Sequence, residues 1–514
     1  MLIDARSIPE EKVIETDVCI VGAGAAGITL AKEFMGGPFR VALIESGNLD
    51  FEADTQNLYK GENLGHSYRP LDAVRLRYLG GTTNHWGGNC RPLDASDFEE
   101  REWIPHSGWP FPKTELDPYY ERAQPILQLG PYAYTPKSWE TGQNPPLPFK
   151  GKRLTTAMFQ QRRTNFGQVY RSELDKAGNI TTYLNANVID IDTNETASKA
   201  TRLRIATLEG NRFWIRARIF VLATGGIEVP RLLLLSNRIQ KVGLGNQNDL
   251  VGRFFLEHPI LHVGTIALSN PGTSTSLYEK RDVNDFVVKG FLTPSIETQR
   301  ELKLLNFGMR PSLVRRSRIS KGVASYKVLR KGFQEREVPD DFFTHLSNVI
   351  REIDEVYESR GKGQHKALGV RYWQECAPNP LSRVTLNTDK DALGMSRVSL
   401  DWRLTDMDKN SMRQALKLVG EEVGRAGIGR LHLAYDSDEL WSERIAGSAH
   451  HMGTTRMSDD PRKGVVDRDA KVHGIGNLYI ASSSVFPVTG HVNPTLTIVA
   501  LSVRLADHIK ERMA

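Results

Sequence analysis

Near the C-terminus, two short stretches place histidine and asparagine beside turn-forming residues. GSAHHMGTTRM at 447–457 holds the adjacent His450 and His451, and HVNPT at 491–495 holds His491 and Asn493. A neutral imidazole within hydrogen-bond reach of a hydroxyl can accept its proton, and a neutral amide can orient the same oxygen. A histidine in a globular protein more often satisfies a buried backbone group, so this interpretation depends on a binding site for a second reactant.

The first fifty residues predict that binding site. DVCIVG at 17–22 is an apolar run typical of a buried parallel strand, and a glycine-rich turn at 22–27 follows it. ITLAKEF then continues as a helix as far as Gly36-Gly37-Pro38, and VALIE at 41–45 is a second strand. The order of these elements indicates a complete βαβ unit.

Each glycine of the turn has a physical role in a dinucleotide site. Gly22 permits the tight turn, Gly24 lets a diphosphate approach the helix N-terminus, and Gly27 lets the helix pack against the strand. Glu45 ends the second strand, where it can accept hydrogen bonds from an adenosine ribose. NAD and FAD share this pattern, so the unit alone does not choose between them.

Farther along the chain, the strand patterns change character. FVLATGG at 220–226 is an apolar strand before a helical pattern, and it can extend the first sheet. SRVTLNT at 382–388 and SRVSLDWR at 396–403 alternate in the way of antiparallel strands within an irregular stretch at 270–440. We therefore expect a second domain inserted into the first.

Composition limits the classes of protein to consider. The 514 residues carry a net charge of +6, from 67 basic and 61 acidic side chains, an excess too small to predict nucleic-acid binding. Seven basic side chains at 315–331 form a solvated loop or receive an anionic substrate or partner. Three scattered cysteines, no export signal and no run of 18 apolar residues predict a cytoplasmic protein without a membrane span.

At LGGTTNHWGG, residues 79–88, the chain resembles the glucose-methanol-choline (GMC) family of flavin-dependent alcohol oxidoreductases. The resemblance also rests on the glycine-rich turn with Glu45, on ATGG with NDLVGRFFLEHP at 248–259, and on the segment from AHHMGTTRM to HVNPTLTIVALSVRLADHI. FGQVYRSELDKAGNITTYLNANV at 166–188 is most similar to pyranose oxidases and bacterial glycoside 3-oxidases. GGTTNHW is also similar to membrane-associated fructose and gluconate dehydrogenases.

The resemblance implies an α/β fold with a Rossmann-type FAD-binding domain built from discontinuous segments, and an inserted, mostly antiparallel substrate domain. We assign 1–100, 151–270 and 440–514 to the FAD-binding domain, and 101–150 and 271–439 to the substrate-binding domain. The resemblance aligns His450 and Asn493 with the two catalytic positions of the family. His491 is the runner-up for Asn493, and it and His450 are the predicted substrate contacts.

The resemblance further implies FAD as cofactor, bound without a covalent link, although His85 matches a position that carries such a link in fungal pyranose oxidases. Ser482 stands where many members have Asp, which changes the predicted hydrogen bonding to the cofactor. The predicted cofactor-binding residues are Gly22, Gly24, Ala25, Gly27, Glu45, Gly81, Thr82, Asn84, His85, Trp86, Gly87, Val188, Thr224, Gly225, Ser482, Asn493 and Thr495.

These features predict oxidation of a secondary sugar or glycoside hydroxyl to a ketone, at C3 or C2, with O₂ or a quinone-type compound reoxidising the flavin. Three alternatives stay open: a nicotinamide-dependent dehydrogenase, a non-catalytic flavin-binding protein, and the catalytic subunit of a sugar dehydrogenase complex with a haem partner. A homo-oligomer is also compatible with the sequence. We expect no metal at His258 and His262, because Pro259 interrupts a helix there and no acid or cysteine completes a set. GxSxG is absent, which disfavours a serine hydrolase.

Overall fold

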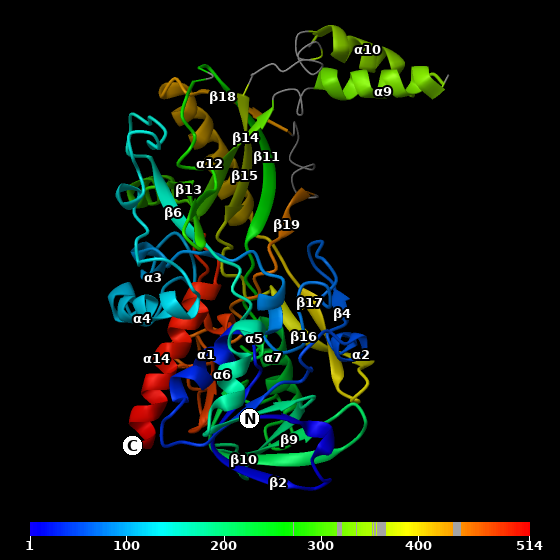
Figure 1. The fold of residues 1–514 in the computed structure, drawn as a ribbon, viewed down its shortest axis with the longest axis vertical. Helices are drawn as coiled ribbons and strands as arrows, with labels where there is room; N and C mark the ends of the chain where they lie inside the picture. Colours follow the sequence, from blue (N-terminus) through cyan, green and yellow to red (C-terminus); the bar gives the residue numbers. More distant parts are fainter. Residues whose placement is uncertain are drawn as a thin grey trace.

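The structure is a computed structural model that describes residues 1–270, 272–315, 321–335, 337–351, 353, 356, 366–434 and 444–514. Within these ranges the chain forms two large sheets at opposite ends of an elongated molecule, with a small third sheet beside the lower one (Figure 1). The predicted α/β fold, a Rossmann-type sheet combined with an antiparallel one, is confirmed.

The lower sheet contains the βαβ unit. Its order is β1 (Leu2–Asp4), β7 (Ile180–Leu184), β3 (Val41–Ile44), β2 (Val13–Val21), β10 (Arg212–Leu222), β9 (Ala200–Ala206) and β8 (Asn187–Thr193), with β20 (Leu478–Ile480) also on β10. The strands from β1 to β10, and β20, pair in parallel, whereas β9 and β8 are antiparallel. Helix α1 (Ala25–Phe34) follows β2 and packs against the C-terminal helix α14 (Thr495–Met513).

The upper sheet is antiparallel. Its order is β18 (Gly429–Leu433), β11 (Pro259–Leu268), β15 (Lys366–Gln374), β14 (Phe307–Arg315), β13 (Phe286–Pro294), β6 (Leu154–Gln161) and β5 (Asn89–Cys90), with β12 (Arg281–Val283) on β13 and β19 (Ala446–Gly447) on β11. Helix α12 (Asp406–Arg425) covers one face, where its Leu416 and Val419 share a buried cluster with Met158, Leu292 and Met309 of the strands. The opposite face of this sheet points away from α12.

The third sheet joins β16 (Arg383–Lys390), β17 (Ser396–Asp401) and β4 (Gly61–Asn63). It contacts α7 (Gly225–Leu235) beside the lower sheet, so the two strands predicted at 382–403 are real but lie outside the antiparallel sheet of the upper half (Figure 1).

The predicted domain limits differ from this arrangement in other places. β6 and β11 lie in the upper sheet although 151–270 was assigned to the lower domain, and α4 (Lys113–Ile126) packs on α14 although 101–150 was assigned to the upper one. Each long-range pairing depends on residues far apart in the sequence, which local pattern does not reveal.

Two helices, α9 (Lys321–Glu335) and α10 (Phe342–Arg351), pack on each other and project beside the upper sheet (Figure 1). The predicted basic segment lies partly in α9 and partly outside the described residues. No helix among the described residues is long and apolar enough to cross a membrane. The remaining short helices are η1 (Ala5–Ser7), α2 (Ala53–Asn57), η2 (Gly81–Asn84), α3 (Ala95–Phe98), η3 (Pro136–Ser138), α5 (Phe166–Val169), α6 (Arg171–Lys176), α8 (Ile296–Leu302) and η5 (Ser483–Val485).

Candidate functional site

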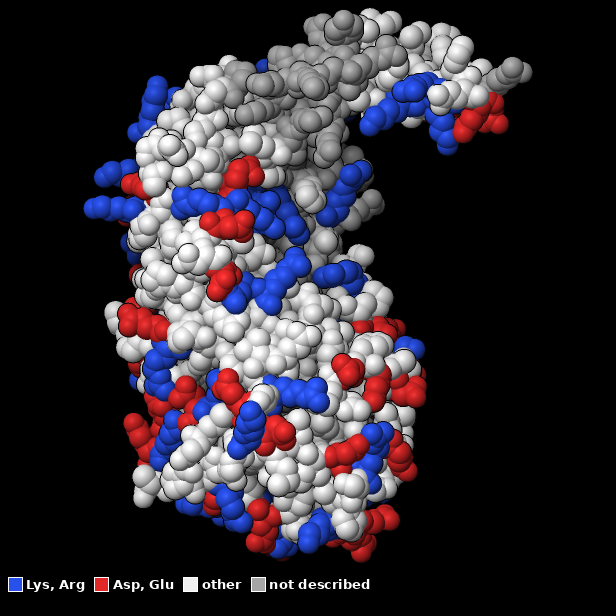
Figure 2. Space-filling view, viewed as in Figure 1, with Lys and Arg blue, Asp and Glu red and all other residues white. Residues whose placement is uncertain are grey.

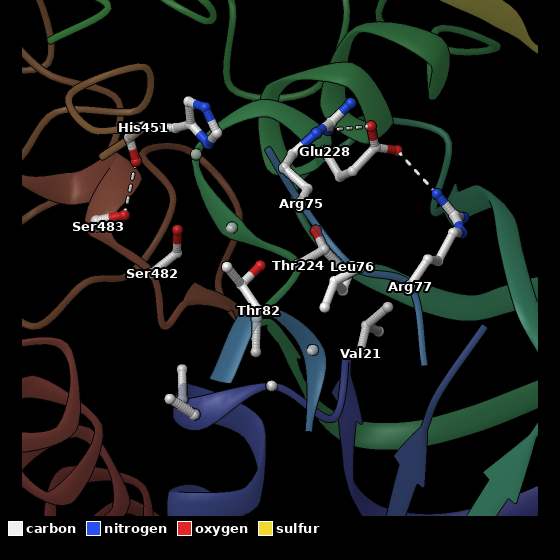
Figure 3. Close-up of a pocket in the computed structure, with 18 of the residues that line it drawn as sticks. Val21, Arg75, Leu76, Arg77, Thr82, Thr224, Glu228, His451, Ser482 and Ser483 are labelled. Carbon is white, nitrogen blue, oxygen red and sulfur yellow. Dashed lines mark hydrogen bonds and ion pairs between the residues drawn. The ribbon is translucent and has the colours of Figure 1, made fainter. Parts of the chain in front are cut away.

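A cavity of about 240 Å³ runs from the glycine-rich turn after β2 to the histidines near the C-terminus (Figure 3). Its walls come from the carboxyl ends of β2 and β10, from η2, and from the start of α14. In Figure 3, Thr82 of η2 and Thr224 lie near its centre, while Arg77 and His451 mark opposite sides. The predicted residues at the cavity wall are Gly22, Gly24, Ala25, Glu45, Gly81, Thr82, Trp86, Val188, Thr224, Gly225, Ser482, Thr495 and His450.

The three glycines occupy different environments. Gly22 has a left-handed φ of +100°, and a Cβ at this position would meet the Ala223 carbonyl oxygen at 2.8 Å. A Cβ at Gly27 would lie 1.8 Å from the Gly22 carbonyl oxygen, so this glycine allows the helix to approach the strand. A Cβ at Gly24 would meet nothing within 4 Å, because this position opens into the cavity.

Glu45 is buried at the end of β3 and is held by backbone donors. Its carboxylate accepts hydrogen bonds of 2.9 Å from the Ala23 and Gly47 N–H groups. Burial raises the pKa of Glu45, although these donors act in the opposite direction. The carboxylate keeps further lone pairs for a ligand hydroxyl, since each oxygen can accept more than one bond.

Four charged residues that the sequence analysis did not select also line the cavity (Figure 3). Glu228 of α7 pairs with Arg75 at 2.7 Å, with Arg231 at 3.1 Å and with Arg77 at 3.4 Å. Burial opposes ionisation, but the three guanidinium groups prevail and lower the pKa of Glu228 to about 2. Arg231 lies three residues after Glu228 on α7, whereas Arg75 and Arg77 meet Glu228 only in the folded chain, so no local motif marks the whole cluster.

His450 and Asn493 lie next to each other in the structure. The Asn493 side-chain amide lies 3.2 Å from His450 Nε2, and His450 lines the cavity. Burial, followed by the nearby His258, lowers the pKa of His450 well below its usual value. The imidazole is therefore neutral at physiological pH.

His258 is a residue of this site that the sequence analysis considered only as a metal ligand. Its Nδ1 lies 2.8 Å from His450 Nδ1, and its Nε2 lies 2.9 Å from the Gly490 carbonyl oxygen. Its position directly after Glu257, within the FFLEHP stretch that carries the resemblance, was the available signal. No group of three potential metal ligands occurs among the described residues.

These contacts define the tautomers of both histidines. A carbonyl oxygen only accepts, so His258 Nε2 carries the hydrogen, and burial lowers the pKa of His258 to about 4, which keeps the ring neutral. Its Nδ1 is therefore an acceptor, and the hydrogen between the two rings belongs to His450 Nδ1. His450 Nε2 consequently presents a lone pair, toward which Asn493 donates.

The backbone around His450 is held in place by Glu257. This buried carboxylate accepts from the N–H of His450 at 3.0 Å and from the N–H of His258 at 2.7 Å, and also from the Tyr68 hydroxyl. Ala449, the residue before His450, has a left-handed φ of 63°, which is uncommon for a residue with a Cβ and is typical of functional turns. The carboxylate thus fixes a strained turn that directs the imidazole.

Several predicted residues take other places. The Asn84 side chain donates to the Leu79 and Gly81 carbonyls at 3.0 and 2.9 Å, so it stabilises the η2 turn. His85 has an exposed side chain, and neither it nor Gly87 is part of the cavity wall. Ser482 Oγ accepts from the Ser484 N–H at 3.0 Å and caps η5, so it holds a turn at the wall.

His491 is fully buried away from this hydrogen-bonded chain. Within the described residues neither of its ring nitrogens has a hydrogen-bond partner, and Asp94 is 3.7 Å from Nδ1. Its backbone oxygen accepts from Trp373 Nε1 at 2.8 Å, which ties the C-terminal segment to the upper sheet.

Known proteins resemble this chain in sequence and in fold. Residues 378–502 match the family model described as GMC oxidoreductase. The chain is 28% identical to the fructose dehydrogenase large subunit of Gluconobacter japonicus over 57% of this chain and 47% of that one, so it spans about half the length of this relative. It is 23% identical to 2-methyl-1,2-propanediol dehydrogenase of Mycolicibacterium austroafricanum, covering 97% and 96%, and 32% identical to C-glycoside 3-oxidase of Arthrobacter globiformis, covering 25% and 24%.

Among solved structures, pyridoxine 4-oxidase from Mesorbium loti superimposes with a TM-score of 0.59 at 17% identity, over 96% of this chain and 99% of that one. That likeness concerns the fold. The sequence match over residues 378–502 confirms the predicted resemblance to GMC oxidoreductases for that segment.

The resemblance to GMC oxidoreductases implies FAD, and the cavity residues fit this cofactor. Thr224 Oγ1 and His451 Nε2 are buried at the wall without a hydrogen-bond partner among the described residues, so each has unused capacity for a ligand. Gly24 leaves open space at the N-terminus of α1, where backbone N–H groups favour a diphosphate. Glu45 would accept from the ribose, and Thr224 would bond a polar atom of the cofactor.

Proposed function

We propose that this protein oxidises a secondary hydroxyl of a sugar or glycoside to a ketone, at C2 or C3, with FAD as the hydride acceptor and His450 as the base. The substrate class is supported by similar proteins that include a fructose dehydrogenase large subunit and C-glycoside 3-oxidases. The chemistry is supported chiefly by one observation: the neutral His450 lines the cavity, and its Nε2 is an acceptor whose partner in the structure is the Asn493 amide.

The protein's own residues account for the proton in this proposal. The substrate hydroxyl replaces Asn493 as the partner of His450 Nε2 and transfers its proton there as the carbonyl forms. FAD, when bound, would supply the acceptor for a hydride from the same carbon, so the alcohol would lose one proton to His450 and one hydride to the cofactor, which is two protons and two electrons in all. His258 keeps its neutral acceptor nitrogen on His450 Nδ1–H throughout, which stabilises the imidazolium that results.

The test is anaerobic flavin reduction, followed by visible absorbance in a screen of free sugars, O-glycosides, C-glycosides and simple alcohols. His450→Ala should slow reduction by roughly 10²–10⁴-fold and leave FAD bound. Because burial holds the pKa of His450 well below 6.5, the wild-type rate should be flat through neutral pH and fall only in clearly acidic buffer, where Nε2 becomes protonated.

His491→Ala is the matched comparison, since it removes a second buried imidazole from the same region. If His491→Ala stops reduction while His450→Ala does not, the base is His491. If no alcohol reduces the flavin, the protein is not a catalyst of this class. Reoxidation of the reduced protein with O₂ or with a quinone then identifies the acceptor.

We also propose that FAD is bound without a covalent link at His85. The exposed side chain of His85 lies outside the cavity wall, which supports a non-covalent site. Acid precipitation of the purified protein should leave all yellow colour in the supernatant. A yellow pellet that keeps its flavin after washing would identify a covalent bond, and His85→Ala would then release it.

A further inference from the structure

The two faces of the upper sheet carry different side chains. Successive residues of a strand point to opposite faces. Met158, Leu292, Met309 and Tyr372 belong to the buried cluster under α12, so their neighbours in the strands lie on the other face. That face, here called the open face, carries the buried Phe159, Lys289, Phe291 and Gly308, the half-buried Arg310 and Trp373 and the exposed Arg371, with the exposed His262 at its β11 edge.

The open face adjoins the C-terminal segment of the proposed active site. A Cβ at Gly308 would lie 3.0 Å from the His491 ring, and Trp373 donates to the His491 backbone oxygen. Arg310 and Arg371 are each two residues farther along the same strands, a rise of about 7 Å. Arg310 and Arg371 therefore lie on the same face as Gly308 and Trp373, one two-residue strand repeat farther from the segment that bears Asn493.

The arginines of this face stand directly opposite each other. Arg310 of β14 pairs in register with Arg371 of β15, which in turn is in register with His262 of β11. Like charges opposite one another on neighbouring strands destabilise a sheet. Within the described part of the chain, neither arginine makes an ion pair or a side-chain hydrogen bond, and burial together with Arg310 lowers the pKa of Arg371.

Lys289 completes the group. It is 2% exposed, and its ammonium donates to Asn89 Oδ1 at 2.6 Å and to Gln161 Oε1 at 2.8 Å, which are neutral amide oxygens. Burial lowers the pKa of Lys289 to about 7, assisted by Arg310, Lys280 and Arg163. Among the described residues no carboxylate compensates it.

We propose that the open face binds an anionic group of the substrate, so that the substrate is an acidic sugar or glycoside. The anion supplies the countercharge for Arg310 and Arg371, whose planar guanidinium groups suit a carboxylate, phosphate or sulfate. On the side shown in Figure 2, Lys and Arg side chains gather where the upper sheet meets the lower half of the molecule. This inference rests on the proposed sugar oxidation and specifies its substrate.

The test compares matched compounds in the holoenzyme: a methyl glycoside, its uronic acid, its 6-phosphate, its 6-sulfate and its 6-amino analogue, in the gluco and galacto series. Anaerobic flavin reduction should show kcat/KM at least about tenfold higher for the best acidic compound than for the neutral one, and lowest for the amine. Comparison of the three acids identifies which anion the face prefers. Equal or better reduction by the neutral or amino compound would overturn the inference while sugar oxidation stood.

Two variants locate the effect. Arg310→Gln and Arg371→Gln should each raise KM for the acidic substrate roughly 10- to 100-fold and leave kcat and all values for the neutral substrate unchanged, because the anion lies away from the reacting carbon. Arg371→Lys should retain part of the binding. Arg212→Gln is the control, since Arg212 is exposed on β10, in the other sheet. If the two open-face variants behave like Arg212→Gln, the inference is wrong.

Calorimetric binding of the uronic acid and of the neutral glycoside does not depend on turnover. If no compound reduces the flavin but the uronic acid binds tighter, and Arg371→Gln removes this preference, then the oxidation proposal fails and the anion site stands. If neither compound reduces the flavin and both bind equally, both proposals fail.

Discussion

Two arginine clusters of this molecule differ in how their charge is compensated. In the lower half, Arg75, Arg77 and Arg231 surround the buried Glu228, and Arg231 also pairs with Asp391 at 2.6 Å. In the upper sheet, Arg310 and Arg371 face each other across two strands, and no described acid pairs with them. A buried charge is tolerated when a partner and hydrogen bonds replace water. The lower cluster is therefore paired within the chain, whereas Arg310 is half-buried and Arg371 exposed, which leaves the upper cluster accessible to the anion that we propose.

Among the variants that test this difference, Glu228→Ala should have the largest effect on the free energy of unfolding. It removes the anion that Arg75, Arg77 and Arg231 share, although Arg231 keeps Asp391, and we expect the free energy of unfolding to fall by about 3–5 kcal/mol. Chemical denaturation of the FAD-free protein measures this loss directly. Arg371→Ala is the matched variant and should cost far less, because it removes a repulsive neighbour. Similar losses in both variants would mean that the two clusters are not different in kind.

The same cluster predicts a pH dependence of stability. The pKa of Glu228 is about 2 in the folded protein, below its usual value of 4.5, because Arg231, Arg75 and Arg77 outweigh the effect of burial. Its contribution is thus fully present above about pH 4.5 and is lost as pH falls toward 2. The free energy of unfolding of Glu228→Gln should therefore change less over that pH range than that of the wild-type protein, because the amide does not titrate.

The sequence predicted the lower half better than the upper one for a physical reason. The turn after β2 depends on residues within thirty positions, and Gly22, Gly24, Gly27 and Glu45 could be assigned individual roles from spacing alone. Thr224 and Ser482 were placed by resemblance, and both line the cavity. Local spacing thus indicated that Gly22, Gly24 and Glu45 of this one supersecondary unit share a site, and all three line the cavity, whereas their binding of FAD stays a prediction.

Sites built by distant pairing escaped the sequence analysis. Arg310 and Arg371 are opposite one another only because β14 and β15 pair with one particular register, and one step of register would send each to the other face. His258 and His450 are separated by 191 intervening residues, since their numbers differ by 192. Their contact was missed because a histidine before a proline at a strand start carries no local sign of its partner.

His258 can be compared with Glu228, because each is a buried residue that satisfies its neighbours. Glu228 pairs with three arginines, and His258 accepts the hydrogen bond from His450 Nδ1–H. His258→Leu removes the acceptor from His450 Nδ1–H and frees the other tautomer, so flavin reduction should slow by roughly 10- to 100-fold. His258→Gln retains a side-chain oxygen that can accept this hydrogen bond, and should recover most of the rate. Stopped-flow reduction across pH measures both variants, and equal rates in the two would assign His258 a purely packing role.

The smallest expected effect on stability comes from the repulsion between Arg310 and Arg371 on the open face. Without an anion, the opposed Arg310 and Arg371 repel each other, and an unfavourable cross-strand pair of this kind is worth about 0.2–1 kcal/mol. Arg310→Gln should therefore raise the midpoint of urea unfolding slightly at low ionic strength, and added salt should remove the difference, because screening weakens the repulsion in the wild type. Arg212→Gln should show neither the gain nor its salt dependence. A loss of stability in Arg310→Gln would mean that this arginine contributes to folding, and the upper cluster would then resemble the lower one.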